Sequence, residues 1–370
     1  MQNISSKNQE TIDVPIQIKP SFITLESSQG DLLLGVIDAN SHKLTWMSKA
    51  QNQVKWIFQK EQDKETTQLP PLEKIVALFD NKADFHIFFT KHQNQGSHSL
   101  WMAISHNYGR TWHDMKQLSD EIQDWDVFTS PIIIQNGLYV NRFVLPYTDQ
   151  SVQRSAFLIS QDNGKTWGSS LYLEPHEEAG MLDDELSGGT LYPSIIENLD
   201  GHLRAYFHVI NWPKIYSSTS PDLGETWSES SHMEQIEIDP SKPYDMIKLL
   251  AKDGDLTTGV LLCGWNPDRS ASDTAVKTNI ENEFKLLVSM DEGNSFETIK
   301  ILYSGQYNAN FGCHLVQDTN REIHIFYSTD PLKIIHEIFD LTPQLTTLSE
   351  EQKKTIENDE NDTSEEDEPE

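Results

Sequence analysis

The octapeptide SQDNGKTW, at residues Ser160–Trp167, decides the fold because close copies of it recur along the chain. The copies read SHNYGRTW from Ser105, SPDLGETW from Ser220 and SMDEGNSF from Ser289, so the four begin 55, 60 and 69 residues apart. In such a turn the Asp side chain accepts hydrogen bonds from nearby backbone N–H groups, and the Gly supplies a positive φ. We therefore expect four equivalent hairpin turns, each followed by a Trp or Phe that packs beside a neighbouring strand.

A hairpin pattern precedes each octapeptide. In Pro193–Phe207, PSIIENLDGHLRAYF, an apolar run leads through a DG turn into a second strand. Such hairpins begin near Pro20, Ile75, Pro131, Pro193, Tyr244 and Gly312. Turn signals between short alternating runs at this spacing predict an all-β, six-bladed β-propeller. We place it at residues 16–342, between a flexible N-terminus at residues 1–15 and an acidic disordered tail at residues 343–370. Because the last hairpin is too short for a full blade, the segment before Pro20 is a candidate to close the ring.

The chain of 370 residues is strongly acidic, with a formal net charge of −30. The stretch Glu350–Glu370 holds 11 acidic residues against two Lys, which leaves about −21 on the rest of the chain. Nucleic acid and anionic membranes both need a basic face, so we expect neither as a partner. The chain shows no signal-peptide pattern and no apolar stretch of membrane-spanning length, so we expect a cytoplasmic protein. We also expect it to be a monomer.

The two cysteines, Cys263 and Cys313, lie in apolar, strand-like surroundings, where a free core thiol is the default interpretation. Neither is close to a second Cys or to a His/Cys cluster with metal-ligand spacing. The sequence therefore predicts no zinc or other metal site, and it predicts no cofactor.

We expect a ligand site at the end of the ring opposite the octapeptide turns, where first strands begin and second strands end. The octapeptides themselves are expected to be structural. The predicted catalytic residues are His208, Tyr192, Tyr244 and Asp149. The predicted substrate-binding residues are Arg204, Arg269, Asp268, Trp212, Trp265 and Arg142. Aromatic rings stack on the apolar faces of a sugar, and the polar groups pair with its hydroxyls, so this set favours a carbohydrate.

Each of these candidates has a plainer interpretation. Tyr192 and Tyr244 can be core or rim aromatics, and His208 can be a hydrogen-bonded strand histidine. Asp268 and Arg269 can form a surface ion pair without any role in binding. The acidic loop at residues 181–189 can be a solvated loop.

With the octapeptides and hairpins placed, the chain resembles the sialidase (neuraminidase) superfamily, in particular the bacterial "predicted neuraminidase" branch with BNR repeats. The resemblance covers roughly residues 20–340 and identifies the octapeptides as Asp-box motifs. It implies an exo-α-sialidase-like glycoside hydrolase that acts on an acidic sugar. Members hold the sugar carboxylate with three arginines, use a Tyr activated by a Glu as nucleophile, and use an Asp as acid/base.

The chain departs from that pattern where the chemistry lies. Lys19 is the only cation at the opening of the first blade, Tyr192 replaces the expected Glu, and Gly312 stands where the nucleophilic Tyr is expected. His208 stands where that branch often carries an Arg, and the chain has only six arginines. Three hypotheses stay open: a hydrolase with an atypical site, a lyase acting on uronates, and a non-catalytic propeller that binds a glycan or a protein.

Overall fold

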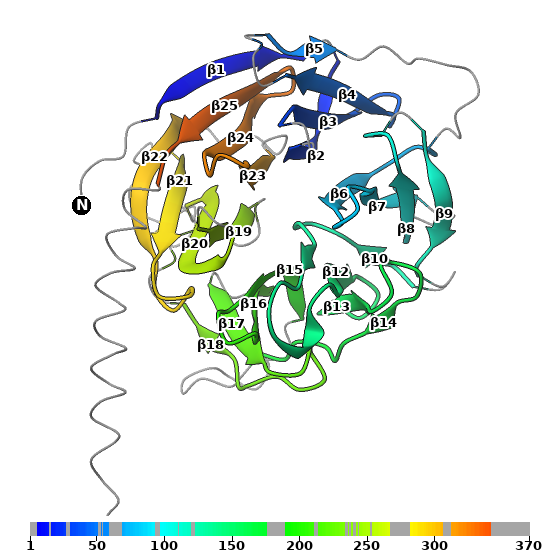
Figure 1. The fold of residues 1–370 in the computed structure, drawn as a ribbon, viewed down its shortest axis with the longest axis vertical. Coiled ribbons are helices and arrows are strands. Elements are labelled where there is room, and N and C mark those ends of the chain that lie inside the picture. Colours follow the sequence, from blue (N-terminus) through cyan, green and yellow to red (C-terminus); the bar gives the residue numbers. More distant parts are fainter. Residues whose placement is uncertain are drawn as a thin grey trace, which may run out of the picture.

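The computed structural model contains six antiparallel sheets, arranged as blades around a central axis in the described part of the chain (Figure 1). This confirms the six-bladed β-propeller. The structure describes residues 6–14, 16–26, 30–50, 53, 55–58, 69–92, 97–109, 111–119, 123–175, 189–210, 214–233, 236, 238–239, 242, 244–251, 254–266, 282–305 and 312–341. The predicted tail at residues 343–370 lies outside these residues.

The first three blades follow the order of the chain, with the first strand innermost. Blade one contains β2 (Ile18–Glu26), β3 (Leu32–Asp38), β4 (Leu44–Lys49) and β5 (Ile57–Phe58). Blade two contains β6 (Lys74–Phe79), β7 (Phe85–His92), β8 (His98–Ser105) and β9 (His113–Gln117). Blade three contains β10 (Trp125–Asp126), β11 (Ile132–Ile133), β12 (Phe143–Asp149), β13 (Arg154–Ser160) and β14 (Gly168–Ser169), with a 3-10 turn, η1 (Gly137–Tyr139).

The last three blades complete the ring. Blade four contains β15 (Thr190–Glu197), β16 (Leu203–Val209), β17 (Ile215–Ser220) and β18 (Ser231–His232). Blade five contains β19 (Tyr244–Leu250), β20 (Leu256–Trp265), β21 (Asn282–Ser289) and β22 (Glu297–Gly305). Blade six contains β23 (Cys313–Gln317), β24 (Ile323–Asp330), β25 (Lys333–Phe339) and, as its outer strand, β1 (Asn8–Asp13).

The ring is closed by the segment before Pro20. Strand β1 pairs antiparallel with β25 from Asn8 opposite Ile338 to Asp13 opposite Lys333. Residues 8–13 are therefore an ordered strand of blade six and not part of a flexible terminus. Burial of Ile12, which is 3% exposed, contributes to ordering a strand whose sequence is otherwise polar.

The octapeptide turns have the hydrogen bonds that their residue types predict. In the second copy, Asp162 Oδ1 accepts from Thr166 N at 2.8 Å, and Ser160 Oγ accepts from Gly164 N at 2.8 Å. Hydrogen bonds from the Thr166 backbone N–H, the Thr166 hydroxyl and the Ser160 hydroxyl lower the pKa of Asp162 to about 2. Gly164 has a φ of +80°, which favours glycine. In the first copy Asn107 makes the corresponding bond to Thr111 N at 2.8 Å.

Aromatic residues of the octapeptides pack against the neighbouring blade. Trp167 of blade three lies with its ring centroid 5.4 Å from that of Phe88, on β7 of blade two. Trp227 of blade four lies 5.4 Å from Phe157, on β13 of blade three. The repeated motif therefore supplies packing between blades as well as a turn within each blade.

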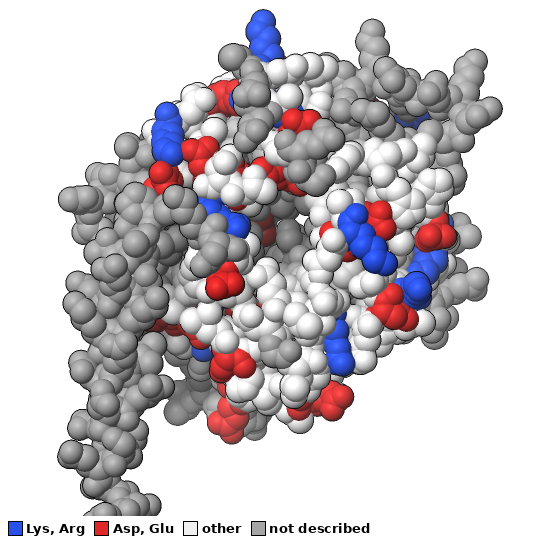
Figure 2. All heavy atoms as spheres, in the orientation of Figure 1, with Lys and Arg blue, Asp and Glu red and all other residues white. Residues whose placement is uncertain are grey.

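Figure 2 shows acidic and basic side chains interspersed over one face of the ring, with a hollow at its centre. Within the residues that the structure describes, no helix has the length and apolar character needed to cross a membrane.

Candidate functional site

A cavity of about 420 Å³ lies where the starts of the innermost strands of the six blades converge, and we refer to it as the axial pocket. Its lining comes from β2, β6, the segment after β10, β15, β19 and β23, or from residues just before them. The first strands begin at the end of the ring opposite the octapeptide turns, so the pocket lies at the predicted end. Its polar and aromatic lining residues are Lys19, Glu73, Lys74, Phe128, Thr129, Ser130, Tyr192, Lys242, Tyr244, Asp245 and His314.

Three lysines from three different blades line the axial pocket, and each has a carboxylate partner. Lys19 pairs with Glu73, Lys74 pairs with Asp126, and Lys242 Nζ lies 3.4 Å from an oxygen of Asp239. Burial lowers the pKa of Lys74, against the opposing effect of the Asp126 carboxylate. The lysines thus place positive charge at the axis without leaving a buried ammonium group unpaired.

Glu73 is surrounded by Lys19 and two histidines. Its Oε1 lies 2.6 Å from His42 Nδ1 and 3.2 Å from His92 Nε2, and Lys19 donates to its other oxygen. Partial burial alone would raise the pKa of Glu73, but the hydrogen bond and charge of Lys19, with the two histidines, bring it below its ordinary value.

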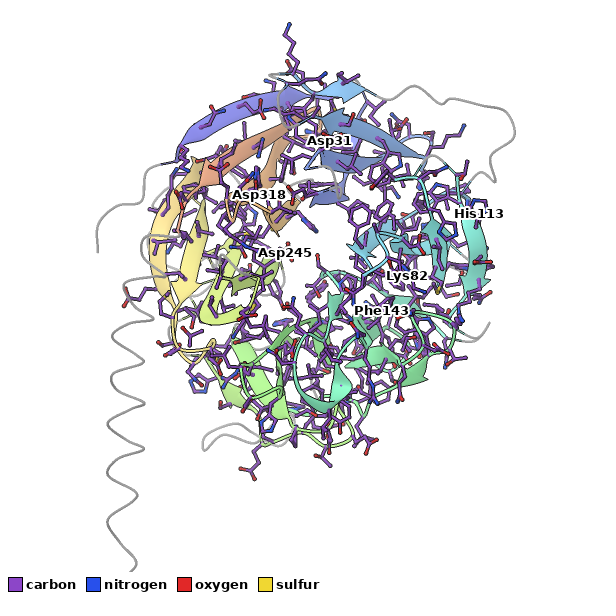
Figure 3. All side chains as sticks on the ribbon, viewed as in Figure 1. Asp31, Lys82, His113, Phe143, Asp245 and Asp318 are labelled. Carbon is purple, nitrogen blue, oxygen red and sulfur yellow. The ribbon has the colours of Figure 1, made fainter. Side chains whose placement is uncertain are left out.

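Asp245 has the opposite environment. It is 2% exposed, its Oδ2 accepts from Leu315 N at 2.8 Å, and its Oδ1 has no hydrogen-bond partner. Burial raises the pKa of Asp245, with only partial compensation from His314, whose Nδ1 lies 3.9 Å from Oδ2. Figure 3 shows Asp245 at the inner edge of the ring.

His314 connects three blades at the axis. Its Nδ1 lies 2.8 Å from Thr24 Oγ1 of blade one, and its Nε2 lies 3.0 Å from Ser130 Oγ of blade three. Burial lowers the pKa of His314, so the ring favours its neutral form. A neutral imidazole with a hydroxyl at each nitrogen can pass a proton in either direction.

The two predicted tyrosines line the pocket, but their hydroxyls are not activated. The Tyr244 hydroxyl donates to the Tyr192 carbonyl oxygen, and burial raises the pKa of both side chains. Tyr192 has a φ of +52° at the irregularity of β15 between Leu191 and Ser194, which turns its ring toward Phe128 at 4.4 Å. Neither tyrosine has the carboxylate-activated hydroxyl that a nucleophile requires.

The other two predicted catalytic residues lie outside this lining. His208 packs behind Tyr192, with ring centroids 6.3 Å apart, and burial lowers its pKa. Asp149 instead accepts hydrogen bonds at the end of β12, from Trp125 Nε1 at 3.1 Å and from the Tyr172 hydroxyl at 3.1 Å. Because Asp149 is the last residue of β12, its carboxylate caps the turn between β12 and β13.

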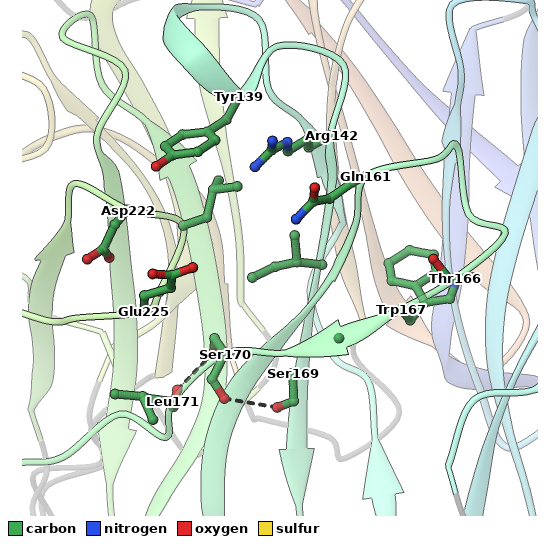
Figure 4. A pocket seen from close by; sticks show the side chains of 14 residues that line it. Tyr139, Arg142, Gln161, Thr166, Trp167, Ser169, Ser170, Leu171, Asp222 and Glu225 are labelled. Carbon is green, nitrogen blue, oxygen red and sulfur yellow. Dashed lines mark hydrogen bonds between the residues drawn. The ribbon is translucent and has the colours of Figure 1, made fainter.

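Arg142 and Arg204 were expected at the ligand end, and the structure places them at the other end. Arg142 lies just before β12 and lines a cavity of about 580 Å³ beside the octapeptide turns, with its guanidinium 4.6 Å from the Tyr139 ring (Figure 4). Arg204 is the second residue of β16, next to the DG turn, and its Nε is buried without a hydrogen bond. Both residues begin second strands, and second strands begin at the turn end of the blade.

The remaining predicted binding residues do not contribute to the described pocket. Trp265 is 2% exposed and packs 5.2 Å from Phe284 in the core of blade five. Trp212, Asp268 and Arg269, like most of the acidic loop at residues 181–189, lie outside the described residues. Among the residues that the structure does describe, no arginine lines the axial pocket.

The predicted site residues did not include Glu73, Lys74, Lys242, Asp245 or His314, all of which line the axial pocket. Each lies at or just before the start of an innermost strand, which is the position that points to the axis. The order of the strands in the sequence therefore carries the signal for these residues.

Residues 36–330 match the family model of the BNR repeat-like domain. The chain belongs to the BNR repeat-like family. The resemblance to the sialidase-like superfamily is thereby confirmed. No curated protein matches the chain in sequence.

Solved structures share the propeller of this BNR repeat-like protein. A protein of unknown function from Dyadobacter fermentans has a TM-score of 0.65 at 13% identity and covers 92% of this chain and 100% of its own. The NanB sialidase of Streptococcus pneumoniae has a TM-score of 0.57 at 14% identity, covering 92% and 71%. The intramolecular trans-sialidase of Ruminococcus gnavus has a TM-score of 0.58 at 15% identity, covering 92% and 97%. At these identities the likeness shows the fold alone.

Proposed function

We propose that the protein is a glycoside hydrolase whose axial pocket binds an acidic sugar. The observation that carries the proposal is the convergence of Lys19, Lys74 and Lys242 with the carboxyl groups of Glu73 and Asp245 in one cavity. Ammonium groups complement the carboxylate of an acidic sugar. A volume of about 420 Å³ falls within the range of small-molecule sites, about 300–1,000 Å³.

The two carboxyl groups have environments suited to different tasks. The raised pKa of Asp245 favours the protonated acid, which would protonate the leaving oxygen. The lowered pKa of Glu73 favours the carboxylate, which would act as base or nucleophile. His314, beside Asp245, supplies a route for the proton to be replaced.

A sialidase-type tyrosine mechanism is not supported by the described residues. Tyr244 donates its proton to a carbonyl oxygen, and its pKa is raised rather than lowered. The pocket carries lysines instead of an arginine triad, and an ammonium group offers a point charge rather than a bidentate fork. We therefore place the chemistry on the two carboxyl groups.

The test is turnover of fluorogenic sialosides and uronides by the full chain and by matched variants. Asp245→Asn and Glu73→Gln should each lower kcat by about 10²–10⁴-fold. Lys74→Met should raise KM, whereas Arg142→Ala, in the cavity of Figure 4, should change neither constant. Activity should fall as pH drops through the pKa of Glu73 and as it rises through that of Asp245. Turnover that survives both carboxyl substitutions would rule out this mechanism.

Binding without turnover is the second candidate function. The observation that favours it is that every lysine of the pocket already has a carboxylate partner. These partners reduce the positive charge available to stabilise a transition state. In this case calorimetry would detect binding of the sugar that Lys74→Met abolishes, while no product forms. An unsaturated product would instead indicate a lyase, with Tyr192 and His208 as the residues to substitute next.

A further inference from the structure

The turn between β23 and β24 brings one histidine and two carboxylates together in blade six, away from the axial pocket. The ligand atoms of Asp318, Glu322 and His324 all lie within 4.8 Å of one another. Asp318 and His324 are buried, and Glu322 is half-buried. Among the described residues, one lysine pairs with this group: Lys7 lies 2.8 Å from Glu322 Oε1 and is itself 48% exposed, so it offsets little of the charge. Figure 3 shows Asp318 in blade six.

A chain of hydrogen bonds from β1 supports the inner nitrogen of His324. It starts at Glu10 of β1, whose pKa is lowered to about 2 because hydrogen bonds from His336, Lys49 and Trp56 outweigh its partial burial. Since Glu10 is a carboxylate, His336 Nδ1, 2.7 Å away, donates to it. His336 is 1% exposed, and its Nε2 lies 2.8 Å from His324 Nδ1, so the inner nitrogen of His324 is occupied by this hydrogen bond.

The outer nitrogen of His324 is buried, faces the two carboxylates and makes no hydrogen bond. His324 is 4% exposed, and its Nε2 lies 3.4 Å from Asp318 Oδ2, which accepts a hydrogen bond from Asn320 Nδ2 at 3.2 Å. A cation between the imidazole nitrogen and the carboxylate oxygens would give all three groups a partner. A metal-binding histidine commonly donates its other ring N–H to a fixed acceptor, which is the arrangement that His336 and Glu10 provide.

We propose that Asp318, Glu322 and His324 bind a divalent transition-metal cation, for which Zn²⁺ is the best match. Zn²⁺ takes imidazole nitrogen and carboxylate oxygen at about 2.0–2.2 Å, and small side-chain rotations bring the three atoms to a common ion. Water would complete the coordination at the exposed side of Glu322. Ca²⁺ and Mg²⁺ prefer all-oxygen sites, so the histidine disfavours them. Cysteine spacing gives no sign of this site, because its three residues are two carboxylates and a histidine.

The site would strengthen the closure of the ring. Through His324 and His336 the ion is linked to Glu10 on β1, which comes from the opposite end of the chain. A cation that binds only the folded state stabilises it by an amount that grows with its concentration. Zn²⁺ should therefore raise the melting temperature.

The experiment titrates the full chain, stripped of metal by a chelator, with ZnCl₂ by calorimetry, and with CaCl₂ and MgCl₂ in separate runs. We expect one Zn²⁺ site and no comparable heat from the other two cations. His324→Ala should abolish this site, and Glu322→Gln, at a half-buried position that tolerates the change, should weaken it by at least about 10-fold. His336→Gln should weaken it by about 10–100-fold, because the support of His324 is altered.

Two variants serve as matched controls. His86→Ala removes a buried histidine from the corresponding turn of blade two, and Glu73→Gln alters the His42–Glu73–His92 group at the axis. Both should leave Zn²⁺ binding and the rise in melting temperature unchanged. The proposal is overturned if Zn²⁺ does not bind, if Glu322→Gln and His324→Ala bind it as the wild type does, or if Glu73→Gln removes the site. His324 would then be a protonated partner of Asp318, or the ion would belong to the axis.

Discussion

The turns of blades two and six have the same local sequence pattern and different surroundings. Each reads Asp, three residues, an acidic residue, one residue, then His: Asp80, Asp84 and His86 in blade two, and Asp318, Glu322 and His324 in blade six. In blade two, His86 Nε2 lies 3.2 Å from Asp80 Oδ2 as a hydrogen bond, and Asp84 pairs with His106 Nδ1 at 2.5 Å. In blade six the carboxylates stay together and face His324 Nε2, which makes no hydrogen bond.

The difference arises from strands distant in the sequence. His86 packs against Phe143 of blade three, and its Nδ1 finds no acceptor, so the proton stays on Nε2 and points at Asp80. In blade six, β1 and β25 place Glu10 and His336 behind His324, so that the hydrogen bond of His324 is made by Nδ1 and Nε2 is left facing the carboxylates. The same turn sequence can thus form a histidine–carboxylate hydrogen bond or the proposed metal site. Contacts with neighbouring strands decide between the two.

The largest difference in stability between the two blades should come from replacing Glu10, which supports the blade-six histidines, and Asp84 of blade two. Glu10→Ala removes a partner of His336, Lys49 and Trp56 together, and should lower the free energy of unfolding by about 2–3 kcal/mol. Asp84→Ala removes only the pair with His106, a side chain 55% exposed, and should cost less than about 1 kcal/mol. Urea denaturation of both variants measures the difference. Equal losses would mean that β1 does not distinguish the blades.

The next effect is a dependence on pH within blade two. Burial lowers the pKa of His86 despite Asp80, whereas the hydrogen bond to Asp84 raises the pKa of His106. The stabilising contribution of neutral His86 is complete above the unfolded pKa of about 6.5 and is lost as pH falls toward its folded pKa. His86→Gln should therefore reduce the acid destabilisation, by at most about 1.4 kcal/mol per pH unit. His106→Gln should change stability with the opposite pH trend, and urea midpoints from pH 7 to 5 test both.

The smallest effect is expected for Zn²⁺ binding at the turn of blade two, where we expect no new site to form. His106→Ala releases Asp84, so the local residues of blade two then match those of blade six. We expect calorimetry to find no second Zn²⁺ site, because binding would move the proton of His86 to a buried Nδ1 that has no acceptor. That penalty, about 1–3 kcal/mol, weakens binding by roughly 10–100-fold. A second site of equal affinity would show that the turn sequence alone suffices.

The fold could be predicted because its signals are local. The hydrogen bonds of an octapeptide such as Ser160–Trp167 lie within eight residues. Each inner hairpin is indicated by an apolar run followed by a turn. The strand β1 was harder to predict, since NQETID has a polar sequence and is ordered by pairing with β25 and by burial of Ile12.

The candidate site could be predicted only in part. Tyr192 and Tyr244 line the pocket as expected, because each lies at the start of an innermost strand. Arg142 and Arg204 lie at the other end of their blades, and Trp265 is in the core, although all three residue types suit a sugar. The residue type indicates which chemistry a side chain can perform. The place of the residue along its strand decides whether that side chain reaches the pocket.

By itself the sequence determined the four octapeptide turns, the six hairpins, and hence the ring and its two different ends. Those features depend on hydrogen bonds and alternation within a few residues, which the chain carries wherever it is placed. Only the tertiary structure decided that Lys19, Lys74 and Lys242 meet at the axis, and that Glu10 and His336 support His324. These relations join residues up to hundreds of positions apart, and their energies depend on burial and direction, which exist only once the ring has closed.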